Sequence, residues 1–363
     1  MDLADGRVRV LVVNAGSSTL KLALIDERDA LTNQREIDAP DSEAVVVAAL
    51  AAMPAVDAVG HRIVHGGERF LEACLIDGGV LEELSALTEL APLHQPPALE
   101  AISAVSAALP GVPQVACFDT AFHATLTPAA RTYALPQAWR ERWPIRRYGF
   151  HGLSHAWVAR RAPELARPAK RIVSCHLGAG ASLCAIAEGR SIDTTMGFTP
   201  LEGLVMATRS GSVDPGLVVW LADRMTHEEL SRGLERESGL LGLAGSGDMR
   251  ELLEQAGRGE ERAMLALDVY CHRLRSQIAA MVAALGGIDV LAFTGGVGEN
   301  ASAIRAQVVH GLAFLDAALD EGANAAATGD ANISGAGARV QTVVISARED
   351  LEIARQTRAV LGR

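Results

Sequence analysis

The 363-residue chain is poor in aromatic residues, which make up 4% of it. Its hydrophobic cores must therefore be built from Ala, Val, Leu and Ile. Cysteine is scarce too: the five cysteines are scattered and odd in number, and no two have the C-x-x-C spacing. This pattern argues against a disulfide framework and a zinc site, and it favours a reducing, cytoplasmic location.

Positive charge is also in deficit, because 33 Lys and Arg stand against 44 Asp and Glu, a formal net charge of −11. Such a charge argues against broad contact with nucleic acid or an anionic membrane surface, so neither is expected as a partner. A phosphate ligand is still compatible with it, because local arginines and backbone N–H groups can bind phosphate on an acidic protein.

Long apolar runs are missing. The longest, around residues 278–285, is too short to span a bilayer, and residues 8–13 are too short for the core of a signal peptide. We therefore expect a soluble, cytoplasmic protein.

Several familiar active-site motifs are absent as well. The chain has no G-x-x-x-x-G-K-[ST] phosphate loop, no G-x-G-x-x-G after a strand and no G-x-S-x-G. Ser18 and Lys21 match S-x-x-K, but the S-D-N and K-T-G partners of β-lactamases are missing, so we interpret the match as chance.

What is present is a repeated pattern of strand, glycine-rich loop and strand. It occupies residues 8–25 and returns about 160 residues later, at 171–187, a separation typical of a duplicated domain. The remaining pattern predicts further strands and helices in alternation, which favours an α/β fold. We expect strands at 289–293 and 340–345, and helices at 81–90, 97–109, 157–166, 215–225, 262–285 and from about Arg348, with a loop-like stretch at 321–338.

Three glycine-rich turns each follow a predicted strand: NAGSST, LGAGAS and TGGVGEN. Glycine lets the backbone approach a ligand closely, and consecutive N–H groups in such turns can bind an anion. Each turn alone is better explained as an ordinary connection between elements. Together, in this order, they resemble the acetate and sugar kinase, Hsp70 and actin superfamily.

Within that superfamily, the chain resembles the acetokinase family nearly from end to end. The motifs that carry the likeness are NAGSSTLK (14–21), VGHRIVHGG (59–67), LAPLHQPP (90–97), CFDTAFH (117–123), RRYGFHGLSH (146–155), SCHLGAGAS (174–182), DTTMGFTPLEGLVMATRSG (193–211), SGDMR (246–250), FTGGVGEN (293–300) and AREDLEIARQT (347–357).

The resemblance implies an α/β fold of two duplicated RNase H-like (actin-like ATPase) domains with an interdomain active-site cleft. We expect an N-terminal domain at 1–120 plus 351–363 and a C-terminal, nucleotide-binding domain at 121–350. The segment between Asp26 and Val59 is shorter than is usual in the family, which we interpret as a trimmed surface excursion.

Four residues are candidates for catalysis: Arg62, Asp119, His151 and Arg209. Phosphoryl transfer needs charge stabilisation and in-line positioning, which arginines in Gly-rich turns can supply. The resemblance assigns Arg62 and Arg209 to the carboxylate and the transferring phosphoryl group, His151 to the phosphoryl group, and Asp119 to Mg²⁺ or the reacting oxygen. Exposed arginines, a buried core histidine and a helix N-cap are the open alternatives.

The resemblance also implies three binding sets. The acetate site would be lined by Arg62, Val64, Leu93, His94, Phe150 and Pro200. ATP would contact Asn14, Ser17, Lys21, His176, Gly178, Ala179, Gly180, Asp248, Met249, Arg250, Gly295, Gly296, Val297, Gly298 and Asn300. Mg²⁺, with Mn²⁺ as an alternative, would be held by Asn14, Asp119 and Asp350.

Two positions depart from the family pattern. Ala179 stands where the family has Asn, so a side-chain donor to the ATP phosphates is missing. Asp350 replaces a Glu, and we expect its shorter carboxylate to reach Mg²⁺ through water.

The implied reaction is a reversible in-line transfer of the γ-phosphoryl group of ATP to acetate, which gives acetyl phosphate and ADP. A homodimer is implied as well. Three alternatives remain: a propionate kinase, a non-catalytic nucleotide-binding switch, and an actin-like ATPase or chaperone.

Overall fold

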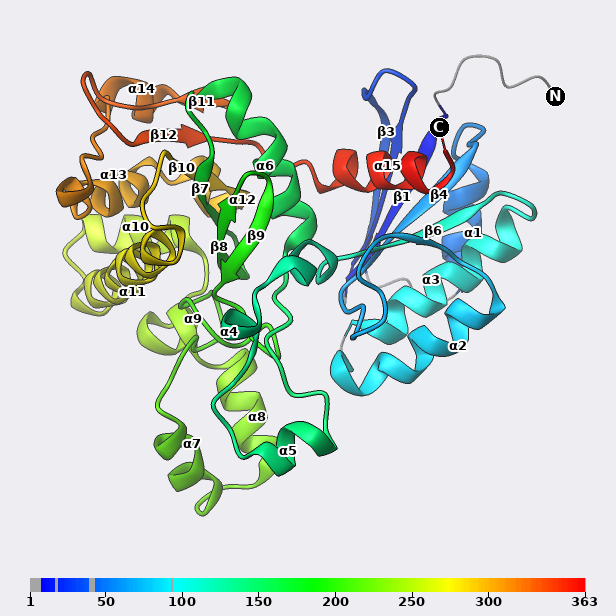
Figure 1. Ribbon diagram of the computed structural model, residues 1–363, viewed down its shortest axis with the longest axis horizontal. Coiled ribbons are helices and arrows are strands. Elements are labelled where there is room, and N and C mark those ends of the chain that lie inside the picture. The colour runs from blue at the N-terminus through cyan, green and yellow to red at the C-terminus, as the bar shows by residue number, and fades with distance from the viewer. Residues whose placement is uncertain (1–7, 17–18, 39–42, 93, 363) are drawn as a thin grey trace. The chain divides into compact units, whose positions relative to one another are not determined.

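The computed structural model describes residues 8–16, 19–38, 43–92 and 94–362. The chain forms two units, each built on one six-stranded mixed sheet (Figure 1). One unit comprises Met1–Ala124, Gly152–Trp157 and Arg348–Arg363, and the other Thr125–His151 and Val158–Ala347. The predicted α/β class is confirmed. The predicted domain bounds, 1–120 with 351–363 and 121–350, stay a prediction, as does the interdomain cleft.

The first sheet has the strand order β3-β2-β1-β4-β6-β5. β1, β2 and β3 form an antiparallel meander, β4 and β6 run parallel to β1, and β5 runs antiparallel to β6. The strands are β1 (Val10–Ala15), β2 (Thr19–Ile25), β3 (Leu31–Asp38), β4 (Ala58–Ile63), β5 (Cys74–Leu75) and β6 (Gln114–Phe118).

The second sheet repeats this plan, because its order β9-β8-β7-β10-β12-β11 has the same pattern of strand directions. The duplication predicted from the two glycine-loop patterns is thus visible in the topology. The strands are β7 (Arg171–Leu177), β8 (Ala181–Ala187), β9 (Arg190–Thr194), β10 (Val290–Thr294), β11 (Ala331–Asn332) and β12 (Gln341–Val344).

Helices cover both faces of the first sheet. Successive residues of a strand face opposite sides, so Val59 in β4 packs with Val105 of α3, whereas Gly60 faces Thr357 of α15. The last helix therefore lies against the first sheet, although most of the second unit comes between them in the sequence. The helices of this unit are α1 (Glu43–Ala51), α2 (Gly78–Ala86), α3 (Gln95–Ala108) and α15 (Glu349–Val360), with 3₁₀ turns η1 (Leu87–Leu90) and η2 (Ala121–Thr125).

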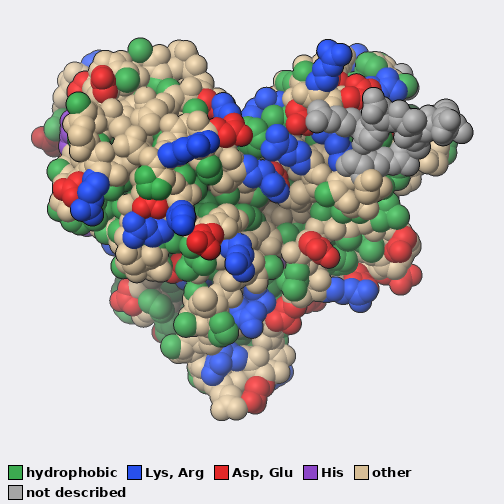
Figure 2. Space-filling view, turned by 45° about the horizontal axis from the view of Figure 1, so that its top comes forward, with side chains coloured by type: hydrophobic (Ala, Val, Ile, Leu, Met, Phe, Trp, Pro, Cys, Tyr) green, Lys and Arg blue, Asp and Glu red, His purple; other side chains and the backbone are tan. Residues whose placement is uncertain are grey.

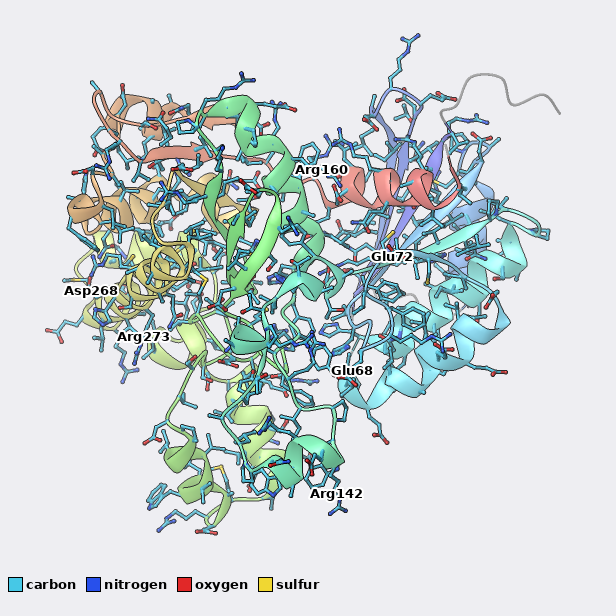
Figure 3. The ribbon with its side chains drawn as sticks, viewed as in Figure 1. Glu68, Glu72, Arg142, Arg160, Asp268 and Arg273 are labelled. Carbon is cyan, nitrogen blue, oxygen red and sulfur yellow. The ribbon has the colours of Figure 1, made fainter. Side chains whose placement is uncertain are left out.

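The longest helix of the second unit, α11 (Glu261–Leu285), packs on β8 and β9. Ala266, Tyr270 and Leu274 recur every four residues on its buried side, as expected of an amphipathic helix. Asp268 and Arg273 project from its exposed side (Figure 3). The other helices are α4 (Pro128–Arg131), α5 (Gln137–Arg142), α7 (Pro215–Ala222), α8 (His227–Arg236), α9 (Gly239–Ala244), α10 (Met249–Gly257), α12 (Gly295–Asn300), α13 (Ser302–His310) and α14 (Glu321–Ala326), with the 3₁₀ turn η3 (Ala313–Leu315). Helix α6 (Gly152–Leu165) belongs to both units, because Gly152–Trp157 is part of the first.

Three elements differ from the sequence prediction. The predicted glycine turn TGGVGEN is the short helix α12, whose cap Thr294 ends β10. The helix predicted at 157–166 already begins at Gly152, because a Cβ there would overlap the carbonyl oxygen of Asp119 and only glycine fits. The stretch 321–338 contains α14 and the edge strand β11 rather than only a loop.

Acidic and basic side chains are interspersed on the face drawn in Figure 2. In the part of the chain that the structure describes, no helix combines the length and apolar character needed to cross a membrane.

Candidate active site

In the first unit, three polar side chains lie at the carboxyl ends of three neighbouring parallel strands. Asn14 and Arg62 are the next-to-last residues of β1 and β4, and Asp119 follows β6. The Arg62 guanidinium donates Nη2 to Asp119 Oδ2 at 2.6 Å and Nη1 to Asn14 Oδ1 at 3.3 Å. Strand ends at one edge of an α/β sheet are where ligands usually bind. The structure thus brings together three of the predicted site residues.

A second carboxylate faces the same arginine. Glu349, in the first turn of α15, has its Oε2 3.7 Å from Arg62 Nε. Asp350, which we predicted to bind metal, instead holds its neighbour Arg348, with Oδ1 2.9 Å from Arg348 Nε. A helix turns by about 100° per residue, so two adjacent acids point in different directions. The sequence reasoning missed Glu349 for this reason.

Burial and charge act in opposite directions on Arg62. Burial alone would lower the pKa of its guanidinium, but the charges of Asp119 and Glu349 outweigh burial and raise that pKa above its ordinary value. Arg62 therefore remains a cation. Because two acids surround it, it is one part of a compact polar cluster rather than a solvated surface arginine.

This cluster offers the oxygen donors that Mg²⁺ prefers. The candidates are the amide oxygen of Asn14 and the carboxylates of Asp119 and Glu349. Among the described residues, no three His, Cys, Asp or Glu side chains converge as a closed metal site. Mg²⁺ keeps several waters and commonly binds through one or two carboxylates plus substrate phosphate. The donor set thus fits such an ion.

In the second unit, His151 and Arg209 converge above Gly180. A Cβ added to Gly180 would lie 3.3 Å from His151 Nε2 and 3.7 Å from Arg209 Nη1. The His151 ring stacks on His176, with centroids 4.3 Å apart, and its Nδ1 lies 2.9 Å from Ser182 Oγ. Ser182 was not among the predicted site residues, although it belongs to the loop motif that contains Gly180.

The backbone of His151 is strained. Its φ of 56° is in the left-handed region, which is uncommon for residues other than glycine. Strain of this kind persists only where the surroundings hold it, and it is concentrated at functional sites. Here His176 and Ser182 hold the ring, which favours a functional role over that of an ordinary core histidine.

Arg209 has a charge with no acidic partner. Its Nη1 donates to Pro200 O at 3.4 Å, and among the described residues no acid forms an ion pair with it. Burial of the side chain lowers the pKa of the guanidinium, and the charge of Glu235 opposes this in part. A half-buried, uncompensated guanidinium is suited to bind an anion.

The loop between β7 and β8 is closed by its own backbone. Gly178 N donates to Gly180 O at 2.9 Å, and Ala179 O accepts from Ala207 N at 3.0 Å. The Ala179 side chain is exposed and carries no donor. Any phosphate contact made here must therefore come from the backbone.

Some of the predicted nucleotide residues in α12 and α10 are exposed, and others are packed against the rest of the unit. In α12, a Cβ on Gly295 would lie 2.8 Å from Leu177 O, whereas Gly296 is exposed with open space around it. In α10, the side chain of Met249 is buried in the core. Asp248 caps this helix, and its hydrogen bond with Arg250 lowers the pKa of its carboxyl to about 2.

The other predicted site residues are in varied surroundings. Lys21 lies opposite Asn14 across β1 and β2, and its Nζ is 3.2 Å from Glu36 Oε1 on β3. Phe150 is buried, and half-buried side chains are found at Val64, His94, His176, Pro200 and Val297. Asn300 donates Nδ2 to Gly296 O at 2.8 Å, while the backbone of Gly298 packs close to Phe293. Ser17 and Leu93 lie outside the described residues.

Comparison with known proteins places this geometry in a family. Residues 37–355 match the model of the acetokinase family. An acetate kinase of Leifsonia xyli subsp. xyli is 46% identical over 387 residues, covering 96% of this chain and 97% of its own length.

Two solved structures are also similar over almost their whole length. The crystal structure of Porphyromonas gingivalis acetate kinase has a TM-score of 0.91 and 36% identity, covering 97% of this chain and 99% of that one. A propionate kinase from Francisella tularensis subsp. tularensis has a TM-score of 0.90 and 34% identity, with the same coverage.

Proposed function

The chain belongs to the acetokinase family, and from this premise we propose how its own residues carry out phosphoryl transfer. Its activity is that of an acetate kinase, a phosphotransferase whose acceptor is a carboxyl group. In our proposal, a carboxylate oxygen of acetate attacks the γ-phosphorus of ATP in line, and ADP leaves. No general base is needed, because a carboxylate is already ionised at neutral pH.

The single observation that best supports this proposal is the Arg209 guanidinium, which is half-buried and has no acidic partner among the described residues. The transferring phosphoryl group carries its charge on equatorial oxygens, and a preorganised cation stabilises that charge as it develops. We assign Arg209 and the neighbouring His151 to these oxygens. Gly180 leaves the space that both side chains need.

In the first unit, we assign Arg62 to the acetate carboxylate and the phosphoryl group. Asp119 and Asn14 hold the guanidinium in a fixed orientation through hydrogen bonds on two sides. Val64, two residues further along the chain, is assigned to the acetate methyl group, together with the predicted Leu93, His94, Phe150 and Pro200.

We propose that Mg²⁺, with Mn²⁺ as an alternative, is held by Asn14 and Asp119. The predicted ligand Asp350 is kept, and we add Glu349 as a further ligand because the Glu349 carboxylate faces Arg62. When bound, the ion would neutralise charge on the ATP phosphates. The chain's own side chains orient the acceptor and bind the transferring group.

For the nucleotide, we keep the predicted assignments. The backbone of residues 178–180 is assigned to the phosphates, and α12 with Asp248, Met249 and Arg250 to the adenosine. The exposed Gly296 supports this assignment, because open space around its Cα admits a ligand close to the backbone.

We also propose a homodimer. Helix α7 is almost wholly apolar, yet Leu217, Val219 and Trp220 are exposed on it. An exposed apolar patch of this kind often marks an association surface. The molar mass in solution, from sedimentation equilibrium, tests this proposal.

A cytoplasmic location is proposed from the cysteines. None of the five is in a disulfide, and Cys117, Cys175, Cys184 and Cys271 are buried. Free thiols in such number are typical of a reducing compartment.

The proposed reaction is tested by acyl phosphate formation from ATP and Mg²⁺ with acetate, propionate or butyrate offered in turn. We expect the highest kcat/KM with acetate. A higher value with propionate would favour the alternative represented by the Francisella relative. Formation of no acyl phosphate with any acid would contradict the proposal.

A further inference from the structure

Between β9 and α7 the chain runs through residues 195–214 without a helix or strand. This segment carries both Pro200 and Arg209. Arginine side chains on irregular backbone are free to move unless something fixes the backbone. Its first half is contacted by two side chains from outside the predicted site, Tyr133 and Arg147, which also bind Glu202 within the segment.

Arg147 binds the start of the segment. Its Nη1 donates to the carbonyl oxygens of three consecutive residues, Thr194, Thr195 and Met196, at 3.1, 3.1 and 3.0 Å. Its Nη2 donates to Glu202 Oε1 at 2.7 Å. A single planar guanidinium thus links the beginning of the segment to a residue eight positions later.

Glu202 and Tyr133 complete the cluster. The Tyr133 hydroxyl donates to Glu202 Oε2 at 2.6 Å and accepts from Phe198 N at 2.9 Å. Burial, and next the hydrogen bond to Glu202, raise the pKa of this phenol, so it stays protonated as a donor. A Cβ on Gly197 would overlap both Glu202 Oε2 and the Tyr133 hydroxyl, which shows how closely the cluster packs on the backbone.

The backbone that Tyr133, Arg147 and Glu202 hold contacts the Arg209 side chain and the residues just before His151. Gly197 O accepts from Tyr148 N at 3.0 Å and from Gly149 N at 3.2 Å, just before His151. Pro200 O accepts from Arg209 Nη1. The same short stretch therefore sets the approach of the chain to His151 and the direction of the Arg209 guanidinium.

We propose that Tyr133, Arg147 and Glu202 are positioning residues for phosphoryl transfer, which act by fixing residues 194–202 against His151 and Arg209. This inference rests on the proposed roles of His151 and Arg209. None of the three acts on substrate directly. Because Arg147 and Glu202 neutralise each other, the cluster fixes the backbone without compensating the charge of Arg209.

The test uses Tyr133→Phe and Glu202→Gln, singly and together. Both keep the size of the side chain and remove part of the hydrogen-bond cluster. Misplacement of catalytic groups by about 1 Å can lower the rate on the order of 10²-fold. We expect kcat to fall by roughly 10- to 100-fold in each variant, with the KM for ATP little changed, because the affected groups act in the transition state.

The double variant should be about as active as the less active of the two single variants, because the two side chains act as one unit. Tyr270→Phe is the matched control, since its buried hydroxyl has no hydrogen-bond partner among the described residues. We expect wild-type kcat for it. Thermal unfolding and the folded fraction are measured for every variant.

The inference is wrong if both single variants keep wild-type kcat, or if the loss disappears once rates are corrected for the folded fraction. Additive losses in the double variant would also overturn it. Failure of the proposed function itself gives a different result. Arg209→Ala would then keep wild-type turnover, irrespective of the kcat of the Tyr133 and Glu202 variants.

Discussion

At the residue scale, Arg209 is the most informative side chain, because its guanidinium is half-buried and forms no ion pair with an acid among the described residues. Replacing Arg209 with Ala should lower kcat on the order of 10³-fold or more, as for other arginines that stabilise phosphoryl transfer. Stability should change little, because within the described part of the chain the side chain makes a single hydrogen bond, at 3.4 Å. Steady-state kinetics with acetate and ATP measure the effect.

The control for this variant is Arg232→Ala. Arg232 lies in the same unit and pairs with Glu237 on the surface, with 49% of its side chain exposed. Its loss should leave kcat unchanged. Near-normal turnover of Arg209→Ala would mean that this guanidinium is not part of the reaction.

Val64 concerns the choice of acid. The side chain is β-branched and stiff, and it is half-buried two residues after Arg62. Val64→Ala removes two methyl groups and should admit the extra methylene of propionate. One methylene is worth roughly 1–3 kcal/mol in an apolar site, so the acetate/propionate ratio of kcat/KM should shift by about tenfold to a hundredfold.

This shift should appear mainly in KM, because the methyl end of the acid lies away from the reacting oxygen. Both acids are measured on the wild type and on the variant. An unchanged ratio, or a wild type that already prefers propionate, would show that Val64 does not line the acid site.

Three of the candidate site residues predicted from the sequence lie together because the fold itself brings them there, while their roles stay a prediction. Asn14, Arg62 and Asp119 were chosen from different segments, and parallel neighbouring strands carry them to one sheet edge. The sequence analysis assigned Asp350 to the metal and did not consider Glu349, whose carboxylate faces Arg62, because helix phase relative to the sheet depends on packing. The proposed positioning residue Tyr133 lies more than sixty positions from its partner Glu202 in the sequence, and no local pattern links the two.

At the element scale, the contact of β4 with α15 depends on Gly60. A Cβ there would overlap Thr357 Oγ1 and lie 2.6 Å from Ile353 Cγ2. Gly60→Ala should push α15 from the sheet and destabilise the first unit by about 1–3 kcal/mol, as overpacking does elsewhere. Thermal unfolding followed by circular dichroism measures the loss.

Gly78→Ala is the matched control. Gly78 begins α2, nothing lies within 4 Å of an added Cβ, and alanine favours a helix more than glycine does. This variant should be neutral or slightly stabilising. Equal unfolding temperatures for Gly60→Ala and the wild type would mean that α15 shifts without cost.

The elements themselves were predicted unevenly. Long apolar helices such as α11 and the strands beside the first two glycine loops were found close to their true bounds. The two-residue strands β5 and β11 were not, because pairing with a neighbour defines them and composition does not. TGGVGEN was interpreted as a turn on its glycines, yet it forms α12, whose first residue, Gly295, has a positive φ.

At the scale of the whole molecule, stability should depend on pH through His61. The imidazole is fully buried beside Gln114, and burial lowers its pKa from 6.5 to about 4. Between pH 6.5 and 4, His61 binds a proton in the unfolded chain but stays neutral in the folded chain. Stability is therefore complete above pH 6.5 and falls by about 1.4 kcal/mol per pH unit towards pH 4, a total of about 3 kcal/mol.

His61→Gln removes this titration, so its free energy of unfolding should fall less steeply than that of the wild type between pH 6.5 and 4. Urea unfolding at several pH values gives both slopes. His227→Gln, at an exposed position, is the control and should follow the wild type. Parallel profiles for His61→Gln and the wild type would contradict the assignment.

The return of α15 to the first sheet has a consequence for synthesis on the ribosome. Arg358 donates to Val8 O at 3.0 Å and pairs with Asp29, so residues made after the second unit bind residues made before it. At translation rates of about 5–20 residues per second, roughly ten to fifty seconds pass between the synthesis of β6 and that of α15. During that interval one apolar face of β1, β4 and β6 is uncovered on the nascent chain. A chaperone would find its binding site there, and a truncated transcript would yield a first unit without its cover.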